Sequence, residues 1–329
     1  MSNTDKMPLP ERLLGTVKKW LGIAYRSSDT PVNDTKEEPA AVKTDEKPLT
    51  EKLLEIAKKE IRITYRKSDA PLPALSSKIG GKPAVPHDFA WPHYTGTAYN
   101  ENESKRRPLS FLAQINLKDV ADLDEETPLP KSGVLSFFYE LETMTWGFDP
   151  KDKGSARVFY FPDESDLSIA DFPEGLEEYS KLPENAVDLK QNISLPGYCE
   201  FDDDTEYEWE EYDECSAKLG YEPDDGSGDR NKLFGYPDVI QNPMESECET
   251  VTRGYRIGNP EDSAKIPEKE KADIKAKADE WILLFQMGTV NDDGYELMFG
   301  DCGYIYFWIK KTDLKNGNFD NIWLILQCG

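Results

Sequence analysis

Residues that hold metals or form disulfide bonds are scarce in this sequence. It has two histidines and five cysteines in 329 residues, and no two cysteines stand in a C-x-x-C arrangement. An odd number of scattered cysteines argues against a disulfide framework and against a structural zinc site. Reduced thiols are typical of the cytosol, so we expect a cytoplasmic protein that holds no metal.

Signals for secretion or membrane insertion are also missing from the sequence. The first residues lack the basic region and apolar core of a signal peptide. The apolar runs are too short to span a bilayer. We therefore expect neither export nor membrane insertion.

The common catalytic signatures are absent as well. The sequence contains neither the nucleophile elbow G-x-S-x-G nor the phosphate loop G-x-x-x-x-G-K-[ST]. Gly80-Gly81-Lys82 comes nearest to a phosphate loop, but Pro83 blocks the helix that should follow. A near-copy at 235–237 indicates a structural turn instead. We expect no cofactor, and the sequence leans against an enzyme without excluding one.

Negative charge is abundant. Asp and Glu number 64 against 39 Lys and Arg, which gives a formal net charge of −25, and residues 199–229 hold fourteen acidic residues and one lysine. This charge repels phosphate backbones and anionic lipids, so we expect no nucleic-acid or membrane partner. A basic peptide or a basic protein partner is allowed. The simpler alternative is that the acidic residues keep the protein soluble.

Residues 8–31 and 48–71 are near copies of one another. Thirteen of the twenty-four aligned positions are identical. Each copy has the spacing of a short amphipathic helix followed by a β-type segment, with Leu53, Leu54, Ala57 and Ile61 on one helical face of the second copy. We take the second copy as integral to the main domain. The first belongs to an appendage, 1–47, and residues 8–31 are a candidate contact to a neighbouring subunit.

A second, fainter repeat divides the domain at 48–329. Three motifs recur in the same order: K-Φ-x-G-x-P (Φ is apolar) at 78 and 232, a glutamine that closes an apolar strand, and an aromatic strand that follows a glycine. The order predicts two related halves, about 72–165 and 228–326, packed into one pseudo-symmetric unit.

An acidic insert, about 199–229, separates the halves. Trp209, Tyr212, Cys215 and Leu219 form one stripe at helical spacing, which predicts a surface helix. Another helix is expected at 267–280, with Pro267 in its first turn. We therefore predict an α+β fold, namely an internally duplicated mixed or antiparallel sheet domain with peripheral helices and an N-terminal helix–strand repeat.

These motifs resemble those of the YwqG-like family, a bacterial-type domain family of undetermined function. The resemblance is carried by SKIGGKPAVPHDFAWP (77–92), LSFLAQINL (109–117), GVLSFFY (133–139), KLFGYPDVIQ (232–241), LLFQM (283–287), GDCGYIYFWI (300–309) and LILQCG (324–329). It covers the chain from near residue 50 to the C-terminus, and the first repeat copy lies outside it. It implies an intracellular duplicated α+β fold and no particular reaction.

Two loops hold candidate ligand-binding residues. His87 and His93 are six apart in a proline-rich loop, where they and Asp88 are weak candidates for metal ligation and are otherwise ordinary loop histidines. Trp91 and Trp146 lie in loop-like contexts beside glycine and proline. They either form a face that stacks on a sugar or peptide, or pack beneath their loops.

Three further candidates come from strand ends and an acidic cluster. Gln114 and Gln286 end apolar strands at equivalent places in the two halves. A buried amide must find hydrogen-bond partners, so each glutamine either pins a neighbouring turn or flanks a ligand cleft between the halves. Asp301 belongs to a carboxylate cluster without the order of a calcium-binding loop.

The sequence leaves two classes of function open. The first is a non-enzymatic binding or interaction protein with an acidic surface, whose partner is a basic peptide, a protein or a small molecule. The alternative is a carboxylate- or metal-dependent hydrolase. Two carboxylates with shifted pKa values in one cavity would favour the hydrolase.

Overall fold

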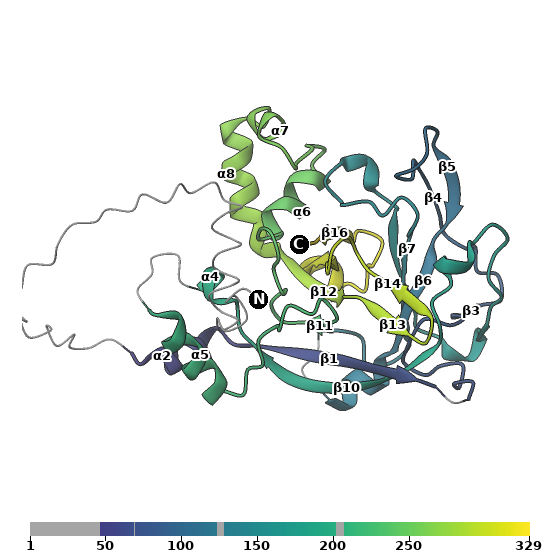
Figure 1. Ribbon diagram of the computed structural model, residues 1–329, viewed down its shortest axis with the longest axis horizontal. Coiled ribbons are helices and arrows are strands. Elements are labelled where there is room, and N and C mark those ends of the chain that lie inside the picture. Colours follow the sequence, from purple (N-terminus) through teal and green to yellow (C-terminus); the bar gives the residue numbers. More distant parts are fainter. Residues whose placement is uncertain (1–46, 69, 124–127, 202–206) are drawn as a thin grey trace, which may run out of the picture. The chain divides into compact units, whose positions relative to one another are not determined.

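The computed structural model describes residues 47–68, 70–123, 128–201 and 207–329, and residues 47–329 form one compact unit. The first repeat copy, 8–31, lies outside the described residues. A ten-stranded sheet dominates the unit, with the strand order β16-β15-β12-β11-β1-β10-β2-β6-β7-β8 (Figure 1). Every neighbouring pair in this sheet is antiparallel. The predicted combination of helices and largely antiparallel strands is confirmed, whereas the duplication and the N-terminal repeat remain predictions.

The bounds of the elements are as follows. The large sheet contains β1 (Lys58–Lys67), β2 (Lys78–Ile79), β6 (Ser110–Asn116), β7 (Val134–Tyr139), β8 (Ala156–Phe161), β10 (Asn185–Ser194), β11 (Asn231–Phe234), β12 (Trp281–Met287), β15 (Tyr304–Lys310) and β16 (Trp323–Gln327). Three small sheets pair β3 (Ala84–Pro86) with β9 (Leu167–Ile169), β4 (His93–Gly96) with β5 (Lys105–Pro108), and β13 (Val290–Asp292) with β14 (Tyr295–Leu297). The α-helices are α2 (Leu49–Ile56), α3 (Leu117–Leu123), α4 (Tyr198–Phe201), α5 (Trp209–Lys218), α6 (Glu245–Thr252), α7 (Pro260–Ala264), α8 (Glu268–Lys277) and α9 (Lys311–Lys315). The 3-10 helices are η1 (Pro150–Asp152), η2 (Glu164–Asp166), η3 (Glu178–Ser180) and η4 (Ala278–Glu280).

Strand β1 lies at the centre of the sheet. It pairs with β10 along its whole length, from Lys58 opposite Ser194 to Lys67 opposite Asn185. Its other edge pairs with β11 only from Glu60 to Ile63. The strands beyond β11 and beyond β2 follow in corresponding order, as β12-β15-β16 and β6-β7-β8. We call β11-β12-β15-β16 and β2-β6-β7-β8 the two arms of the sheet. β1, which lies in the second repeat copy, and β10 join these arms.

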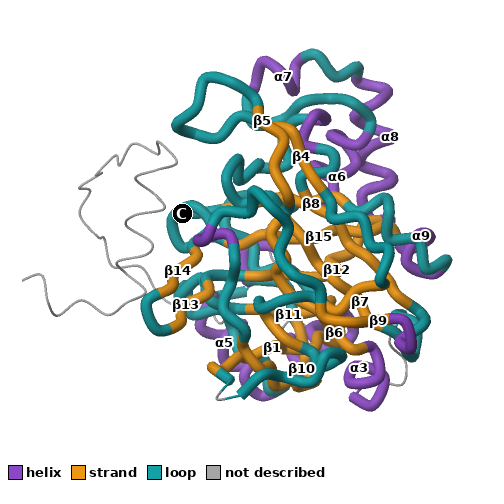
Figure 2. Tube along the Cα trace, turned by 90° about the vertical axis from the view of Figure 1, so that its right-hand side faces the viewer, coloured by secondary structure: helices purple, strands orange, loops and turns teal. Residues whose placement is uncertain are grey.

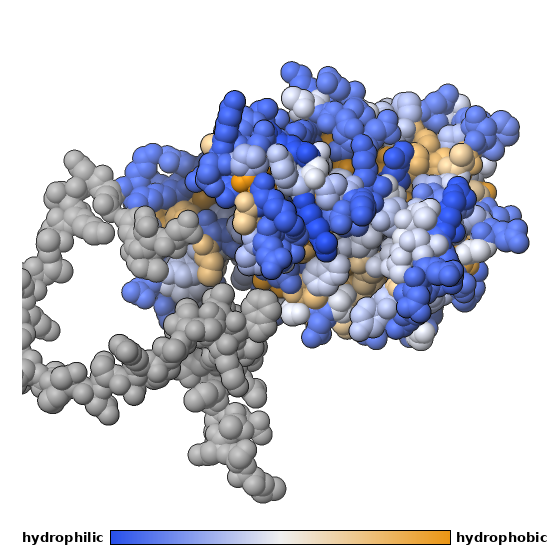
Figure 3. Space-filling model, turned by 90° about the horizontal axis from the view of Figure 1, so that it is seen from above, coloured by the Kyte–Doolittle hydropathy of each residue, from blue (hydrophilic) through white to orange (hydrophobic). Residues whose placement is uncertain are grey.

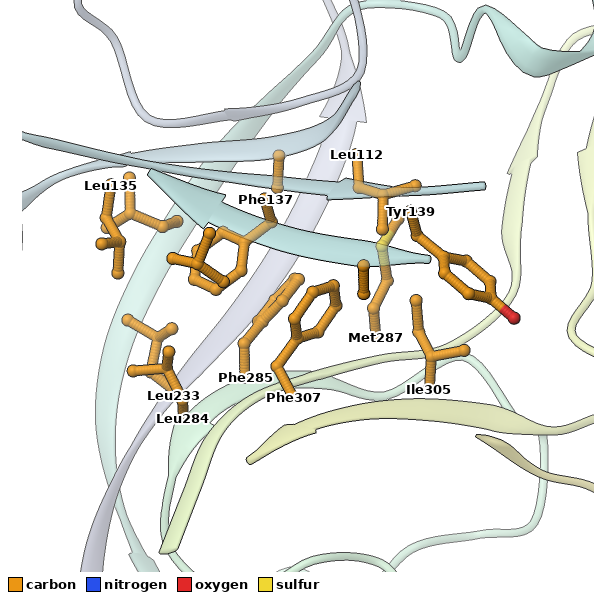
Figure 4. Packing of buried hydrophobic residues seen from close by; sticks show 14 of the residues in the cluster. Leu112, Leu135, Phe137, Tyr139, Leu233, Leu284, Phe285, Met287, Ile305 and Phe307 are labelled. Atoms are coloured by element: carbon orange, nitrogen blue, oxygen red, sulfur yellow. The ribbon is translucent and has the colours of Figure 1, made fainter. Parts of the chain in front are cut away.

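The main hydrophobic core lies between these two arms. Phe137 of β7 packs against Phe285 of β12 and Phe307 of β15, with ring centroids 4.5 and 5.3 Å apart (Figure 4). All three side chains are fully buried. Alternate residues of each strand point into this core, and the residues between them are mostly buried on the outer face of the sheet. The sheet therefore curls so that its two arms face each other.

Other elements cover the outer faces of the arms. Helix α6 packs Cys248 and Val251 against Trp281, Trp308 and other aromatic residues of β12, β15 and β16. Figure 2 shows α3, α6, α8 and α9 along the outside of the strands. None of the helices in the described ranges is long and apolar enough to cross a bilayer. Hydrophilic residues predominate on the face in Figure 3, in keeping with the composition.

Two of the predicted helical faces differ from the structure. Helix α2 ends at Ile56 because Ala57 is extended, with ψ 139°, so Ile61 belongs to β1 instead and Leu54 is 58% exposed. In α5, Tyr212 and Cys215 are buried against α2 as predicted, but Trp209 is 47% exposed. Helix α8 and η4 occupy the range predicted at 267–280, with Pro267 as the residue that precedes the first turn.

Candidate functional site

A groove of about 710 Å³ lies between α3, β10 and the segment that leads into β2. We call it the acidic groove, because Asp119, Asp122 and Asp188 line it and none of its lining residues is Lys, Arg or His. Its apolar lining is provided by Leu72, Leu75, Leu123, Val187 and Leu189. Arg66 lies 3.5 Å from Asp188, but both side chains are about two-thirds exposed, so this ion pair is weak. The groove therefore combines apolar contacts with negative charge that Arg66 offsets only weakly.

Gln114 holds one wall of the acidic groove in place. Its side chain is completely buried, and its Nε2 donates to the carbonyl oxygens of Ala74 and Ser76, each at 2.8 Å. Its Oε1 accepts from the backbone N–H of Ala84 at 3.0 Å. These bonds use both ends of the amide, so Gln114 positions the 74–77 segment and does not face the groove itself.

A buried ion pair fixes the start of the same wall. Lys78 is completely buried, and its Nζ lies 2.8 Å from Glu184 Oε2 and donates to the carbonyl oxygen of Lys82. Glu184 Oε1 accepts from the backbone N–H of Leu72 at 3.1 Å. Burial alone would raise the pKa of Glu184, but the hydrogen bonds from Lys78 and Leu72 outweigh it and hold the pKa below its ordinary value. Glu184 is therefore anionic at neutral pH and ties Leu72 to the sheet.

Strand β10 presents an open edge to the acidic groove. On the side away from β1, its only ladder partner among the described strands is β2, which pairs with Asn185 and Ala186. From Val187 onward, no backbone hydrogen bond from the described residues reaches this edge. Val187, Asp188 and Leu189 line the groove. An open strand edge is a template for another extended chain.

A second groove, of about 580 Å³, occupies the corresponding place in the other arm of the sheet, beside β1 and β11. Gln286 is bonded there as Gln114 is in the first: its Oε1 accepts from Asp238 N at 2.9 Å and its Nε2 donates to Arg230 O at 3.3 Å. Asn231 Oδ1 accepts from Gly288 N, just as Ser77 Oγ accepts from Asn116 N. The arginines Arg62 and Arg230 balance Asp225 and Asp229 in its lining, so this groove lacks the charge of the first.

A cluster of buried charges lies behind the second groove. Lys232 Nζ is 2.8 Å from Asp238 Oδ2 and 3.4 Å from Glu60 Oε2, and all three side chains are at most 7% exposed. Arg62 donates to Glu60, and Arg230 lies 3.3 Å from Asp238. Burial alone would raise the pKa of Asp238, but Lys232 and Arg230 outweigh it and lower the pKa. Each charge here has a partner, which indicates a structural cluster.

A third pocket, of about 490 Å³, lies between η1 and the elements α6, β12, β15 and β16. We call it the indole pocket, because Trp281 and Trp323 line it. Glu249 at its base accepts from Trp281 Nε1 at 2.9 Å, and Lys310 Nζ lies 2.7 Å from its Oε2. Arg253 donates to the other carboxylate oxygen at 2.7 and 2.8 Å. These partners use both oxygens of Glu249.

The two loops with candidate residues lie in different surroundings. His87 is exposed, whereas His93 Nδ1 is 2.9 Å from the carbonyl oxygen of Trp91. Trp91 donates from Nε1 to Leu109 O at 2.8 Å and packs over the outer face of β6 and β7. Trp146 is 41% exposed, and its carbonyl oxygen accepts from Leu326 N.

The remaining candidates lie apart from one another. Asp301 is exposed, and its carbonyl oxygen accepts from Gly329 N. Gln114 and Gln286 are on β6 and β12, with four strands between them. Within the described ranges, no group of three or more His, Cys, Asp or Glu residues is placed to hold a metal ion. Ligand binding by the seven candidates stays a prediction.

Sequence reasoning missed the residues that build the acidic groove. Asp119 and Asp122 are one helical turn apart in α3, and Asp188 lies 66 residues further along the chain in β10. The two buried lysines, Lys78 and Lys232, were visible in the sequence as the first residue of the K-Φ-x-G-x-P repeat. A charged residue that recurs at the head of an apolar motif is a signal for a buried ion pair.

Comparison with known proteins places the chain in a family. No curated protein matches the chain. The family model described as a domain of unknown function, DUF1963, matches residues 77–328, which include every strand of the large sheet except β1. The match covers more than half of the sequence, and the chain belongs to this family of domains of unknown function, DUF1963.

Proposed function

We propose that the protein is a non-enzymatic binding protein whose acidic groove takes an extended, basic and partly apolar peptide from a protein partner. The observation that carries this proposal is the open edge of β10 on the floor of a groove that has three aspartates and no cation among its described lining residues. The peptide adds to the sheet as a further strand beside β10.

The open edge provides the affinity that is independent of sequence. A strand added to an exposed edge gains main-chain hydrogen bonds along its length, and pockets for alternate side chains provide specificity. The free edge of β10 runs from Val187 to Ser194. Eight residues span roughly 26 Å at the rise of a β-strand. A peptide of this length can follow the edge from inside the groove to its end.

The lining of the groove favours a basic and apolar peptide. Lysine or arginine side chains would approach Asp119, Asp122 and Asp188, while aliphatic side chains would pack on Leu72, Leu75 and Leu123. Long basic side chains suit such a surface because their methylene stems cover apolar residues and their charged ends reach the carboxylates. The net charge of −25 also steers a basic partner toward the molecule.

We further infer that the two grooves arose by the duplication that the sequence repeats predict. The contacts of Gln114 and Gln286 support this inference because their partners Ala84 and Asp238 each lie six residues after the lysine of the motif. Ser77 and Asn231, which accept from Asn116 and Gly288, each lie one residue before that lysine. The duplicated halves, the narrower YwqG-like resemblance and an intracellular location belong to the proposal. No specific observation in the described residues favours the hydrolase alternative.

A small molecule is the other ligand class that the sequence allows, and the indole pocket is its candidate site. Its volume of about 490 Å³ lies in the range of small-molecule sites. The indole rings of Trp281 and Trp323 supply apolar walls. Because both oxygens of Glu249 already have partners, this pocket offers less for recognition than the open edge of β10.

Fluorescence anisotropy with a labelled decapeptide of alternating lysine and valine tests the proposal. We expect saturable binding that weakens as salt is added, because the attraction between the charges is screened. The triple substitution D119N/D122N/D188N should raise the Kd about tenfold, since three exposed ion pairs are lost. D225N/D229N in the second groove is the matched control and should leave the Kd unchanged.

A second peptide separates strand addition from simple charge attraction. The same decapeptide with every backbone nitrogen methylated keeps every side-chain charge but cannot donate a hydrogen bond to a β-ladder from either edge. We expect its binding to be lost. Equal affinity of the two peptides, or no binding of the parent peptide, would overturn the proposal.

A further inference from the structure

We propose that the natural occupant of the acidic groove is the segment 18–27 of a second copy of this chain. The inference rests on the proposed function, because it names the peptide that the groove takes. It starts from the repeat: KKWLGIAYRS (18–27) corresponds to KKEIRITYRK (58–67), the sequence of β1.

The segment 18–27 has the composition that the groove requires. It contains Lys18, Lys19 and Arg26 and no acidic residue, so its formal charge is +3. The groove presents three aspartates and no cation among its described lining residues. In a strand, Lys18 and Arg26 would share one face, while Leu21, Ile23 and Tyr25 would follow Lys19 on the other, as Ile61, Ile63 and Tyr65 follow Lys59 in β1. The segment is therefore basic, apolar on one face and β-type in its pattern.

The pairing of β1 with β10 indicates how the segment 18–27 would bind to the open edge of β10. β1 pairs with one edge of β10 over ten residues, and Arg66 of β1 lies 3.5 Å from Asp188 of β10. Arg26 corresponds to Arg66 in the repeat. A strand with the same pattern at the opposite edge of β10 would bring Arg26 near Asp188 from the groove side.

Segment 18–27 cannot replace β1 itself without loss. Where β1 has Glu60, 1% exposed and in contact with Lys232, the copy has Trp20. Where β1 has Arg62, the copy has Gly22. The position between β10 and β11 therefore favours residues 58–67 over residues 18–27. The segment 18–27 remains available to pair with the open edge of β10.

Exchange between two chains makes the contact reciprocal. Each chain carries one segment 18–27 and one acidic groove, so two chains can each donate a strand to the other and close into a twofold dimer. The twenty residues from 28 to 47 reach up to roughly 70 Å when extended. This length lets the segment reach a neighbouring molecule.

Sedimentation analysis of the full chain tests the inference. We expect a dimer at micromolar concentration that dissociates as salt is added. The charge reversals K18E/K19E/R26E and D119K/D122K/D188K should each weaken the dimer about tenfold or more. Mixing these two variants should restore both exchanged contacts, one with the original charges and one with reversed charges, and a chain that carries all six changes should dimerise again. K36E/K43E, outside the segment, is the matched control and should leave the dimer intact.

The outcomes separate this inference from the proposed function. If the lysine–valine decapeptide binds but the full chain stays monomeric throughout the micromolar range, the inference is wrong and the binding function stands. A monomer in which residues 18–27 are protected from hydrogen exchange would mean that the groove takes its own chain, which also overturns it. A dimer that K18E/K19E/R26E leaves unchanged would place the interface elsewhere. If neither the decapeptide nor segment 18–27 binds, the proposed function falls as well.

Discussion

Gln114 offers the most direct test of how the acidic groove is held together. We consider Gln114→Met, which keeps the length and approximate volume of the side chain and removes its three hydrogen bonds. The N–H of Ala84 would be left unpaired in a buried place, which costs about 1–3 kcal/mol. The carbonyl oxygens of Ala74 and Ser76 lie in a half-buried wall, where water can replace the amide, so each adds about 0.5 kcal/mol. We expect the free energy of unfolding to fall by about 3 kcal/mol.

Urea unfolding followed by tryptophan fluorescence measures this change, because the midpoint shifts in proportion to the free energy when the slope is constant. Gln191→Met is the matched control: Gln191 is exposed on β10, and its substitution should change the free energy by less than about 0.5 kcal/mol. Affinity for the lysine–valine peptide should also fall in the Gln114 variant, because the 74–77 wall loosens. If both variants lose the same small amount of stability, the glutamine does not hold the wall and the argument for a preformed groove fails.

Three further substitutions test other parts of the structure. Glu60→Ala leaves Lys232 with one carboxylate fewer in a buried cluster, and we expect a loss of about 3 kcal/mol in urea unfolding; a loss near zero would contradict the cluster. Burial, with a contribution from a neighbouring glutamate, raises the pKa of Glu247 to about 7, so this acid destabilises the fold as the pH rises from about 4.5 to about 7. Glu247→Gln should therefore stabilise the protein by up to about 3 kcal/mol at pH 8 and by little at pH 4, and equal effects at the two pH values would refute the assignment. Gly147 has a φ of +78°, and Gly147→Ala would place a Cβ 1.8 Å from a carbonyl oxygen of β16. This change should lower the melting temperature far more than the control Gly154→Ala, because Gly154 has a similar φ of +92° but open space around it. Similar melting temperatures of the two variants would contradict this geometry.

The strands could be predicted because their pattern is local. A run of apolar and aromatic residues marks a strand that is buried on both faces, and a glutamine near the end of such a strand must find partners close by. The alternative that each glutamine pins a neighbouring turn follows from this requirement, and the bonds of Gln114 and Gln286 to adjacent segments agree with it. Trp281, Trp308 and Trp323 lie on such strands and are buried.

The groove could not be predicted because it depends on the order of strands. The motif spacing says nothing about which strand lies beside β10, and the place of β10 between β1 and β2 brings Asp188 to the helix that carries Asp119 and Asp122. The exposure of Trp209 has a similar origin. Helical spacing groups Trp209 with Tyr212 and Cys215, but α2 and Leu195 cover only the part of α5 that contains the latter two.

The position of β1 has a consequence for what counts as the domain. The family match begins at Ser77, whereas the strand at the centre of the sheet is Lys58–Lys67. A polypeptide that began at residue 77 would contain the whole matched segment and still have a vacancy one strand wide, roughly 10 Å between β10 and β11. The matched segment is thus an incomplete folding unit. Residues 48–76 contain β1, the strand that it lacks. Added back as a separate peptide, they should refold it, as the missing piece of a protein split in two.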